Sequence, residues 1–309
     1  MHLATIDLNG HSVAAVRLGD GSMLDITAAA ATVSGGIGIM LKSASMQSII
    51  EAGPPALDAI RKLLDEAEAG NHEKALHSAG NVNLLAPIPK PLKNVFCVGR
   101  NYADHIAEGD KAQKQSVGVT EHPVYFTKPP TSVIGPNAKI PIFPQLSTAI
   151  DYEVELTLVI GKPGRNIKKA QAFEHIFGYT ILNDITARDV QRRHGGQYFK
   201  GKALDGSSPI GPWIVTADAI SNPHDLSISL SVNGETRQKG NTGSMIFDIP
   251  TLIESLSEGL TLQPGDLIAT GTPSGVGYAM EPPQFLKDGD TVVCEVAEIG
   301  RLENTLHNV

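Results

Sequence analysis

An alternation of apolar and polar residues predicts a β-strand over residues 151–160, Asp-Tyr-Glu-Val-Glu-Leu-Thr-Leu-Val-Ile. Successive side chains of a strand point to opposite faces, so Glu153 and Glu155 share one face. Two carboxylates placed so close together repel each other unless a cation lies between them. A third acid, Asp184, ends a second apolar run over residues 176–183.

These three acids predict a binding site for a hard divalent cation. Carboxylate oxygens suit Mg²⁺, Mn²⁺ or Ca²⁺ better than Zn²⁺, because no cluster of Cys or His accompanies them. The alternative places the glutamates on the solvent face of an edge strand, where isolated Glu residues usually lie. Asp184 argues against that alternative, since it ends an apolar run with no solvent-facing alternation of its own.

The first 90 residues predict a β-meander followed by helices. Turn-forming Asn-Gly and Asp-Gly pairs separate the strands, and a proline begins the second helix. The expected strands cover residues 2–8, 12–18 and 23–26, and the expected helices cover residues 45–52 and 56–69. Three prolines within residues 85–92 mark a domain boundary. We therefore expect a small N-terminal domain over residues 1–88 and a second domain over residues 92–309.

The second domain is predicted to be rich in β-strands. Short apolar runs at 95–98, 124–126, 226–232 and 291–296 are separated by Gly, Pro and Asn. Helical patterns occur only at 103–108 and at 244–260, and Pro250 interrupts the second one. The chain is therefore of the α+β class and β-rich, and the pattern leaves a sandwich, a roll or a barrel open.

Composition narrows the function classes. The 309 residues are 41% hydrophobic and 19% charged, as is typical of soluble globular proteins. The formal net charge of -8 argues against binding nucleic acid or an anionic membrane through bulk charge. The N-terminus lacks the apolar core of a signal peptide, and two cysteines make no disulfide framework. We expect a cytoplasmic protein that acts on a small molecule.

A candidate general base lies near residue 105. Asn101 can cap a short helix whose third residue is Asp104, and His105 and Glu108 then share a face. A glutamate beside a histidine raises the basicity of the ring, as the activation of water requires. The alternative is an ordinary surface ion pair. The polar, aperiodic stretch 109–122 is expected to form a mobile loop that closes over a substrate.

Three further candidates come from the second half of the chain. Arg188 and Gln191, three residues apart, can reach a substrate carboxylate or carbonyl, and Lys202 follows a glycine that lets the backbone approach a ligand. Surface placement is the alternative for all three. Residues 268–277 form a strand and a glycine-rich turn without the Gly-Lys-Ser/Thr ending of a phosphate loop. Nucleotide binding is therefore not expected there, although the backbone amides can still bind an anion.

Five motifs in this order and spacing resemble the fumarylacetoacetate hydrolase family over about residues 92–305. They are Gly99-Arg-Asn-Tyr-Ala-Asp-His105, Asp151-Tyr-Glu-Val-Glu155, Asn183-Asp-Ile-Thr-Ala-Arg-Asp-Val-Gln191, Gly201-Lys-Ala-Leu-Asp205 and Thr270-Gly-Thr-Pro-Ser-Gly-Val-Gly277. The first 90 residues resemble the small, variable domain of many bacterial members.

The resemblance implies a catalytic domain with a mixed β-sandwich roll, usually in a homodimer, and an active-site Mg²⁺ or Mn²⁺. The expected metal ligands are Glu153, Glu155 and Asp184. His105 and Glu108 match the water-activating pair, and Lys202 matches the lysine near the oxyanion. Arg100, Arg188, Gln191 and Thr272 are expected to bind substrate. The hydrolases that name the family supply a fourth metal carboxylate where this chain has Val98, which favours the acylpyruvase and 2-oxo acid branch.

The resemblance leaves several reactions open. The leading hypothesis is metal-dependent hydrolysis of a C–C bond in an acylpyruvate-like 1,3-diketo acid, with a pyruvate enolate leaving on the metal. The alternative is decarboxylation or tautomerisation of an oxaloacetate-like 2-oxo acid, or an isomerase or hydratase reaction through a similar intermediate. A metal-stabilised binding protein without catalysis is the non-enzymatic alternative, and the presence of His105 and Glu108 argues against it.

Overall fold

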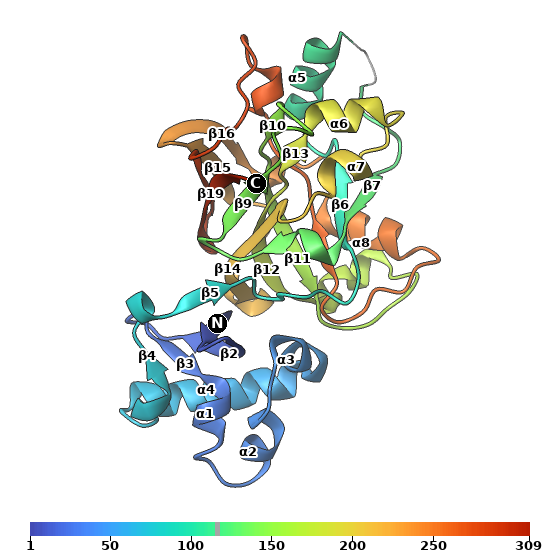
Figure 1. The fold of residues 1–309 in the computed structure, drawn as a ribbon. Coiled ribbons are helices and arrows are strands. Elements are labelled where there is room, and N and C mark those ends of the chain that lie inside the picture. Colours follow the sequence, from blue (N-terminus) through green and yellow to red (C-terminus); the bar gives the residue numbers. More distant parts are fainter. Residues whose placement is uncertain (115–117) are drawn as a thin grey trace.

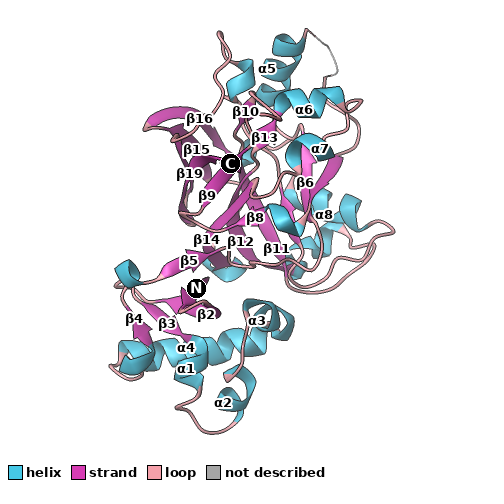
Figure 2. Ribbon diagram, viewed as in Figure 1, coloured by secondary structure: helices cyan, strands magenta, loops and turns pink. Residues whose placement is uncertain are grey.

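The computed structural model describes residues 1–114 and 118–309, and within them two sheets dominate the fold (Figures 1 and 2). The larger sheet has the order β4-β3-β2-β1-β14-β12-β11-β17-β6-β7, with β5 beside β1 and β8 beside β14. Its strands are β1 (His2–Leu8), β2 (His11–Arg17), β3 (Met23–Asp25), β4 (Leu76–His77), β5 (Asn83–Leu85), β6 (Val95–Gly99), β7 (Val124–Lys128), β8 (Val133–Ile134), β11 (Val154–Ile160), β12 (Ile176–Asn183), β14 (Ser208–Thr216) and β17 (Leu267–Ala269).

The second sheet has the order β16-β15-β18-β19-β9, and β10 and β13 pair separately. These strands are β9 (Lys139–Ile142), β10 (Ile150–Asp151), β13 (Thr186–Ala187), β15 (Ser227–Val232), β16 (Glu235–Asn241), β18 (Thr291–Val296) and β19 (Gly300–Asn308). The helices are α1 (Ile26–Ala30), α2 (Gly36–Leu41), α3 (Met46–Ala52), α4 (Pro54–Glu68), α5 (Ala103–Gln113), α6 (Arg188–Arg193), α7 (Phe199–Lys202) and α8 (Ile249–Ser257). Helices α5, α6 and α7 lie at the end of the molecule opposite α1–α4 (Figure 1).

Strand β11 is buried along its whole length, because both of its faces are covered. Val154, Leu156 and Leu158 on one face share a core with Ile228 and other residues of the five-stranded sheet. On the opposite face, Val159 belongs to a second core that it shares with the N-terminal helices. Glu155 lies on that second face but toward the other end of the strand, so its carboxylate is buried and not exposed at a sheet edge.

The first 88 residues share both a sheet and a core with the rest of the chain. Strands β1 and β2 form the predicted hairpin, in which Leu8 pairs with His11 across the left-handed pair Asn9 and Gly10. On its other side β1 pairs with β14, so the N-terminal strands extend the central sheet. The expected domain boundary near residues 88–92 stays a prediction.

The strand-rich α+β class is confirmed, and several local expectations are wrong. The helix expected over 103–108 continues to Gln113, so the loop expected from residue 109 begins later, and residues 115–117 lie outside the described chain. Tyr102, not Asn101, precedes this helix, and the Asn101 amide instead donates to the carbonyls of Phe247 and Thr270. Pro250 stands in the first turn of α8 because the missing N–H of proline costs nothing there.

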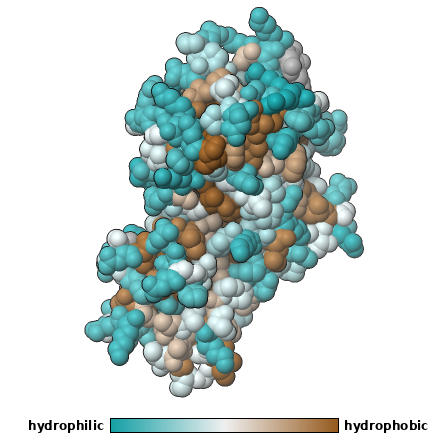
Figure 3. All heavy atoms as spheres, viewed as in Figure 1, coloured by the Kyte–Doolittle hydropathy of each residue, from teal (hydrophilic) through white to brown (hydrophobic). Residues whose placement is uncertain are grey.

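No helix in the described part of the chain is long and apolar enough to cross a membrane. The face drawn in Figure 3 is largely hydrophilic, and its hydrophobic residues form several separate patches. Scattered hydrophobic residues are ordinary on a protein surface.

The close approach of β12 and β14 depends on Gly178, which gives a test of the central sheet. A Cβ atom on Gly178 would lie 2.3 Å from the Val215 carbonyl oxygen, so the strands must separate in a Gly178→Ala variant. We expect a loss of about 1–3 kcal/mol in the free energy of unfolding, measured by urea denaturation. Gly19→Ala is the control, since a Cβ there meets nothing within 4 Å. Equal stability of the two variants would contradict this packing.

Candidate metal centre and active-site cleft

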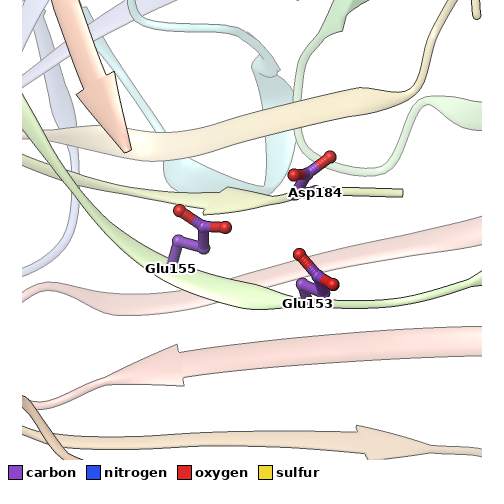
Figure 4. Close-up of side chains that lie close together, drawn as sticks. All are labelled: Glu153, Glu155 and Asp184. Carbon is purple, nitrogen blue, oxygen red and sulfur yellow. The ribbon is translucent and has the colours of Figure 1, made fainter. Parts of the chain in front are cut away.

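Three acids converge where β11 begins and β12 ends (Figure 4). The antiparallel register pairs Val154 with Asn183, and the Asp184 amide donates to the Glu153 carbonyl at 2.8 Å. Glu153, Glu155 and Asp184 are all buried, and one oxygen of each lies within 4.8 Å of the others. The expectation that the three acids meet is confirmed, and their spacing suits a shared divalent cation.

Two buried lysines hold the Asp184 carboxylate. Lys202 Nζ lies between Glu153 Oε2 at 2.8 Å and Asp184 Oδ2 at 2.5 Å, and it also donates to Thr186 Oγ1 at 2.9 Å. Lys128 Nζ donates to Asp184 Oδ1 at 2.6 Å, and its side chain is fully buried. Sequence reasoning missed Lys128, and the available signal was a lysine that ends an apolar strand.

Arg188 lies beside the same acids and forms ion pairs with two of the buried carboxylates. Its Nε donates to Asp151 Oδ2 at 2.8 Å, and one of its terminal nitrogens donates to Glu153 Oε1 at 2.7 Å. Asp151 also accepts the backbone amides of Gly277 at 2.8 Å and Tyr278 at 3.1 Å. Asp151 therefore fixes Arg188 against the turn 277–279. It was missed as a site residue, although it begins the same motif as the glutamates.

The two glutamates have opposite electrostatic environments. Burial would raise the pKa of Glu153, but Lys202 and then Arg188 outweigh burial and hold that pKa well below its ordinary value. Burial raises the pKa of Glu155 well above its ordinary value, and the two neighbouring carboxylates raise it further. The charge of Lys202, and then the Gly271 amide, which donates to Glu155 Oε2 at 2.8 Å, offset this only in part. Among the described residues, Glu155 is thus the acid of this cluster without a direct ion pair to a lysine or arginine.

The charges of the described residues fit a divalent cation. Within this cluster, four buried carboxylates stand against three buried cations. They are Asp151, Glu153, Glu155 and Asp184 against Lys128, Arg188 and Lys202. The excess negative charge is at Glu155. The three expected metal ligands are all carboxylates, whose oxygens suit Mg²⁺ and Mn²⁺ and discriminate poorly between them.

His105 and Glu108 form a hydrogen-bonded pair on α5. His105 Nδ1 and Glu108 Oε1 are 2.9 Å apart, and Glu108 Oε2 accepts the Gly275 amide at 2.8 Å. A proton on Nδ1 that is held by the carboxylate leaves the lone pair of Nε2 available as a base. Only glycine fits at position 275, because a Cβ atom there would lie 2.1 Å from the Arg237 carbonyl oxygen. The structure thus brings the pair together, and its role in catalysis remains a prediction.

A cleft of about 720 Å³ opens beside these groups. Most of the site residues that the sequence predicts are part of its wall: Arg100, His105, Glu153, Arg188, Gln191, Lys202 and Thr272. Val98, the position of the missing fourth carboxylate, also lines it. Glu108 lies behind His105, and Glu155 and Asp184 lie outside this wall, next to Glu153.

Two of these wall residues have structural partners. Arg100 donates to Asp110 Oδ1 at 2.9 Å and to the Gly118 carbonyl at 3.0 Å. Thr272 donates to the Val154 carbonyl at 2.9 Å and accepts from the buried Gln238 at 2.8 Å, another residue that sequence reasoning missed. Both side chains therefore have fixed positions at the edge of the cleft.

The glycine before Lys202 has a packing role. A Cβ on Gly201 would lie 2.6 Å from the Gln191 backbone nitrogen and from its Cβ. Gly201 therefore lets α7 pack closely against α6, whereas the sequence suggested a close approach to a ligand. The result for the site is that Lys202 and Gln191, on two packed helices, both line the cleft.

Comparison with known proteins agrees with this architecture. The family model described as fumarylacetoacetate (FAA) hydrolase C-terminal matches residues 94–307. Oxaloacetate tautomerase YisK of Bacillus subtilis is 46% identical over 265 residues, which are 85% of this chain and 86% of that protein. The human mitochondrial oxaloacetate tautomerase FAHD2A is 42% identical over 84% of this chain and 79% of its own length.

Solved structures give the same result. Fumarylacetoacetate hydrolase from Exiguobacterium antarcticum has a TM-score of 0.81 and 38% identity, with full coverage of both chains. Maleylpyruvate hydrolase from Sphingobium sp. SYK-6, solved with manganese(II) and pyruvate, has a TM-score of 0.75 and 30% identity over 100% of this chain and 99% of that one. The chain therefore belongs to the fumarylacetoacetate hydrolase family, whose members named here are enzymes.

A substitution of Glu155 tests the expected metal site. Losing an outer-shell partner of a metal typically weakens binding about 10- to 100-fold. Glu155 is an expected direct ligand, so we expect Glu155→Gln to weaken Mn²⁺ binding by at least that much. Isothermal titration calorimetry measures the affinity. Glu174→Gln, which changes an exposed glutamate on the surface, is the control. Unchanged Mn²⁺ affinity in Glu155→Gln would place the metal elsewhere.

The raised pKa of Glu155 predicts that metal binding depends on pH. Because the pKa of Glu155 is raised, a proton competes with the metal over a range above the ordinary titration of glutamate. Metal binds the deprotonated carboxylate, so Mn²⁺ affinity should rise with pH by up to about tenfold per pH unit below that pKa. The Glu155→Gln variant should show a flatter pH profile. Parallel profiles for the two proteins would show that Glu155 does not bind the metal.

Proposed function

We propose that this protein is a metal-dependent tautomerase that interconverts the enol and keto forms of an oxaloacetate-like 2-oxo acid. The observation that carries the proposal is that His105, hydrogen-bonded to Glu108, lines the same cleft as Glu153 and Lys202 of the buried acid cluster. Several relatives named as oxaloacetate tautomerases, at 42–46% identity over most of the chain, support the same reaction.

Glu153, Glu155 and Asp184 would hold the divalent cation, which would supply Lewis acidity at the 2-oxo oxygen of a bound substrate. Lys202 adds a fixed positive charge between Glu153 and Asp184. Burial disfavours that charge, but Asp184 and then Glu153 outweigh burial and raise the pKa of Lys202 above its ordinary value. Its three N–H donors already have acceptors, so Lys202 stabilises negative charge without giving up a proton.

His105 then moves the proton. Its Nε2 takes a proton from C3 of the keto acid, and the electron pair of that C–H bond becomes the C2–C3 double bond. The imidazolium returns the proton to the 2-oxo oxygen, which completes the enol. Glu108 favours the imidazolium because its carboxylate accepts the Nδ1 hydrogen bond at 2.9 Å, and the Gly275 amide fixes that carboxylate. The reverse sequence converts enol to keto acid.

The expected hydrolysis of an acylpyruvate is less well supported than tautomerisation. The relatives of highest identity described above are named for tautomerisation, at 42–46%, whereas the two hydrolases described above match this chain at 38% and 30% identity. The same site could polarise a 2-oxo acid for hydrolysis or decarboxylation, so the product distinguishes the three reactions. Tautomerisation alone releases neither CO₂ nor a carboxylic acid.

The reaction is tested with the wild-type enzyme loaded with Mn²⁺ and fresh enol oxaloacetate. We expect the ultraviolet absorbance of the enol to decay faster with enzyme than with Mn²⁺ alone, without matching release of CO₂. Acetylpyruvate, assayed in parallel, should yield little acetate. If CO₂ or acetate appears at the rate at which substrate is consumed, the protein is a decarboxylase or a hydrolase.

The general base is tested by His105→Ala. We expect kcat for enol decay to fall by about 10²- to 10⁴-fold, the usual contribution of a positioned general base. Mn²⁺ affinity should stay unchanged, because His105 is not among the expected metal ligands. His122→Ala, which removes an exposed histidine outside the cleft wall, is the control. Full activity in His105→Ala would assign the base to another group.

A further inference from the structure

The positive charges of the cleft wall differ in how far they are already neutralised. Arg100 is paired with Asp110, Arg188 with Asp151 and Glu153, and Lys202 with Glu153 and Asp184. Arg192 is the exception: no ion pair joins it to a carboxylate in residues 1–114 or 118–309. It is thus the arginine of the wall that has charge available for a ligand.

Arg192 has a defined position despite its exposure. It lies four residues after Arg188 on α6, so the two side chains share a face of the helix. Both guanidinium groups lie over the ring of Tyr278, Arg188 at 4.4 Å and Arg192 at 5.7 Å from the centroid. The two arginines are therefore neighbours on one aromatic surface; Arg188 pairs with two carboxylates, and Arg192 has no ion pair within the described chain.

The Tyr278 ring is itself held in place. Its backbone amide donates to Asp151, and its hydroxyl accepts from Gln113 of α5 at 3.4 Å. A Cβ on Gly109 would lie 2.6 Å from that hydroxyl, so α5 packs directly on the ring. A guanidinium that lies over an aromatic ring keeps its N–H donors in its own plane, where they can bind a carboxylate with two hydrogen bonds.

We propose that Arg192 binds the second carboxylate of the substrate and makes the site selective for 2-oxo dicarboxylates over 2-oxo monocarboxylates. This inference rests on the proposed function, because it assumes that the 2-oxo carboxylate end lies at the acid cluster. The far carboxylate then needs an unpaired cation in the same cleft. Arg188, which the sequence suggested for a substrate carboxylate, already donates to two protein carboxylates.

The test compares oxaloacetate with its methyl ester at the far carboxylate, which has the same skeleton without the charge. Enol decay and calorimetric binding are measured for the Mn²⁺-loaded wild type and for Arg192→Gln. We expect KM and Kd for oxaloacetate to rise about 10- to 100-fold in the variant, as losing a charged hydrogen bond does. The ester should bind both proteins alike, and Arg192→Lys should recover part of the preference.

Arg193→Gln is the matched control, since Arg193 is the next residue of α6, is exposed and does not line the cleft. An equal loss in Arg193→Gln would reduce the effect to general surface charge and overturn the proposal. An equal loss for acid and ester in Arg192→Gln, or no loss for either, would also overturn it. If wild type binds oxaloacetate through Arg192 but does not accelerate enol decay, the proposed function fails and this inference stands.

Discussion

The structure depends on the burial of several carboxylates in one place. A buried carboxylate is stable only if hydrogen-bond donors and positive charges replace the water that it loses. Lys128, Lys202 and Arg188 meet this demand for Asp184, Glu153 and Asp151. Among the described residues they leave Glu155 without a direct ion pair, which is where a divalent cation would add most. The lysines and arginine therefore stabilise the buried acid cluster, and a divalent cation would neutralise its remaining negative charge.

The glycine-rich turn 270–277 supplies the remaining donors. The Gly271 amide binds Glu155, the Gly275 amide binds Glu108, and the Gly277 amide binds Asp151. The sequence suggested that these amides could bind an anion, and the anions are carboxylates of the protein itself. One turn thereby connects the expected metal ligand, the partner of the expected base and the residue that orients Arg188. A substitution in this turn is expected to disturb all three.

The strand period predicts that Glu153 and Glu155 share a face. The apolar run before Asp184 predicts that this third acid is buried and not on the surface. Both are local patterns, so the sequence carries them. Lys128 and Asp151 were missed because their roles depend on contacts across 56 and 37 residues. No periodicity reports such contacts. The expected cap at Asn101 was wrong for a similar reason, because its amide donates to the carbonyls of Phe247 and Thr270, which are distant in sequence.

Arg188 and Arg192 lie on the same short helix, but their charges have different surroundings. Both line the cleft and lie over Tyr278, and sequence spacing alone cannot tell which one faces the substrate. The paired carboxylates decide the matter, because an arginine that neutralises Asp151 and Glu153 cannot leave them without exposing two buried charges. Arg192 has no such obligation among the described residues. The charge that is free to bind a ligand is therefore at the rim of the cleft, while the charges at its base hold the acids in place.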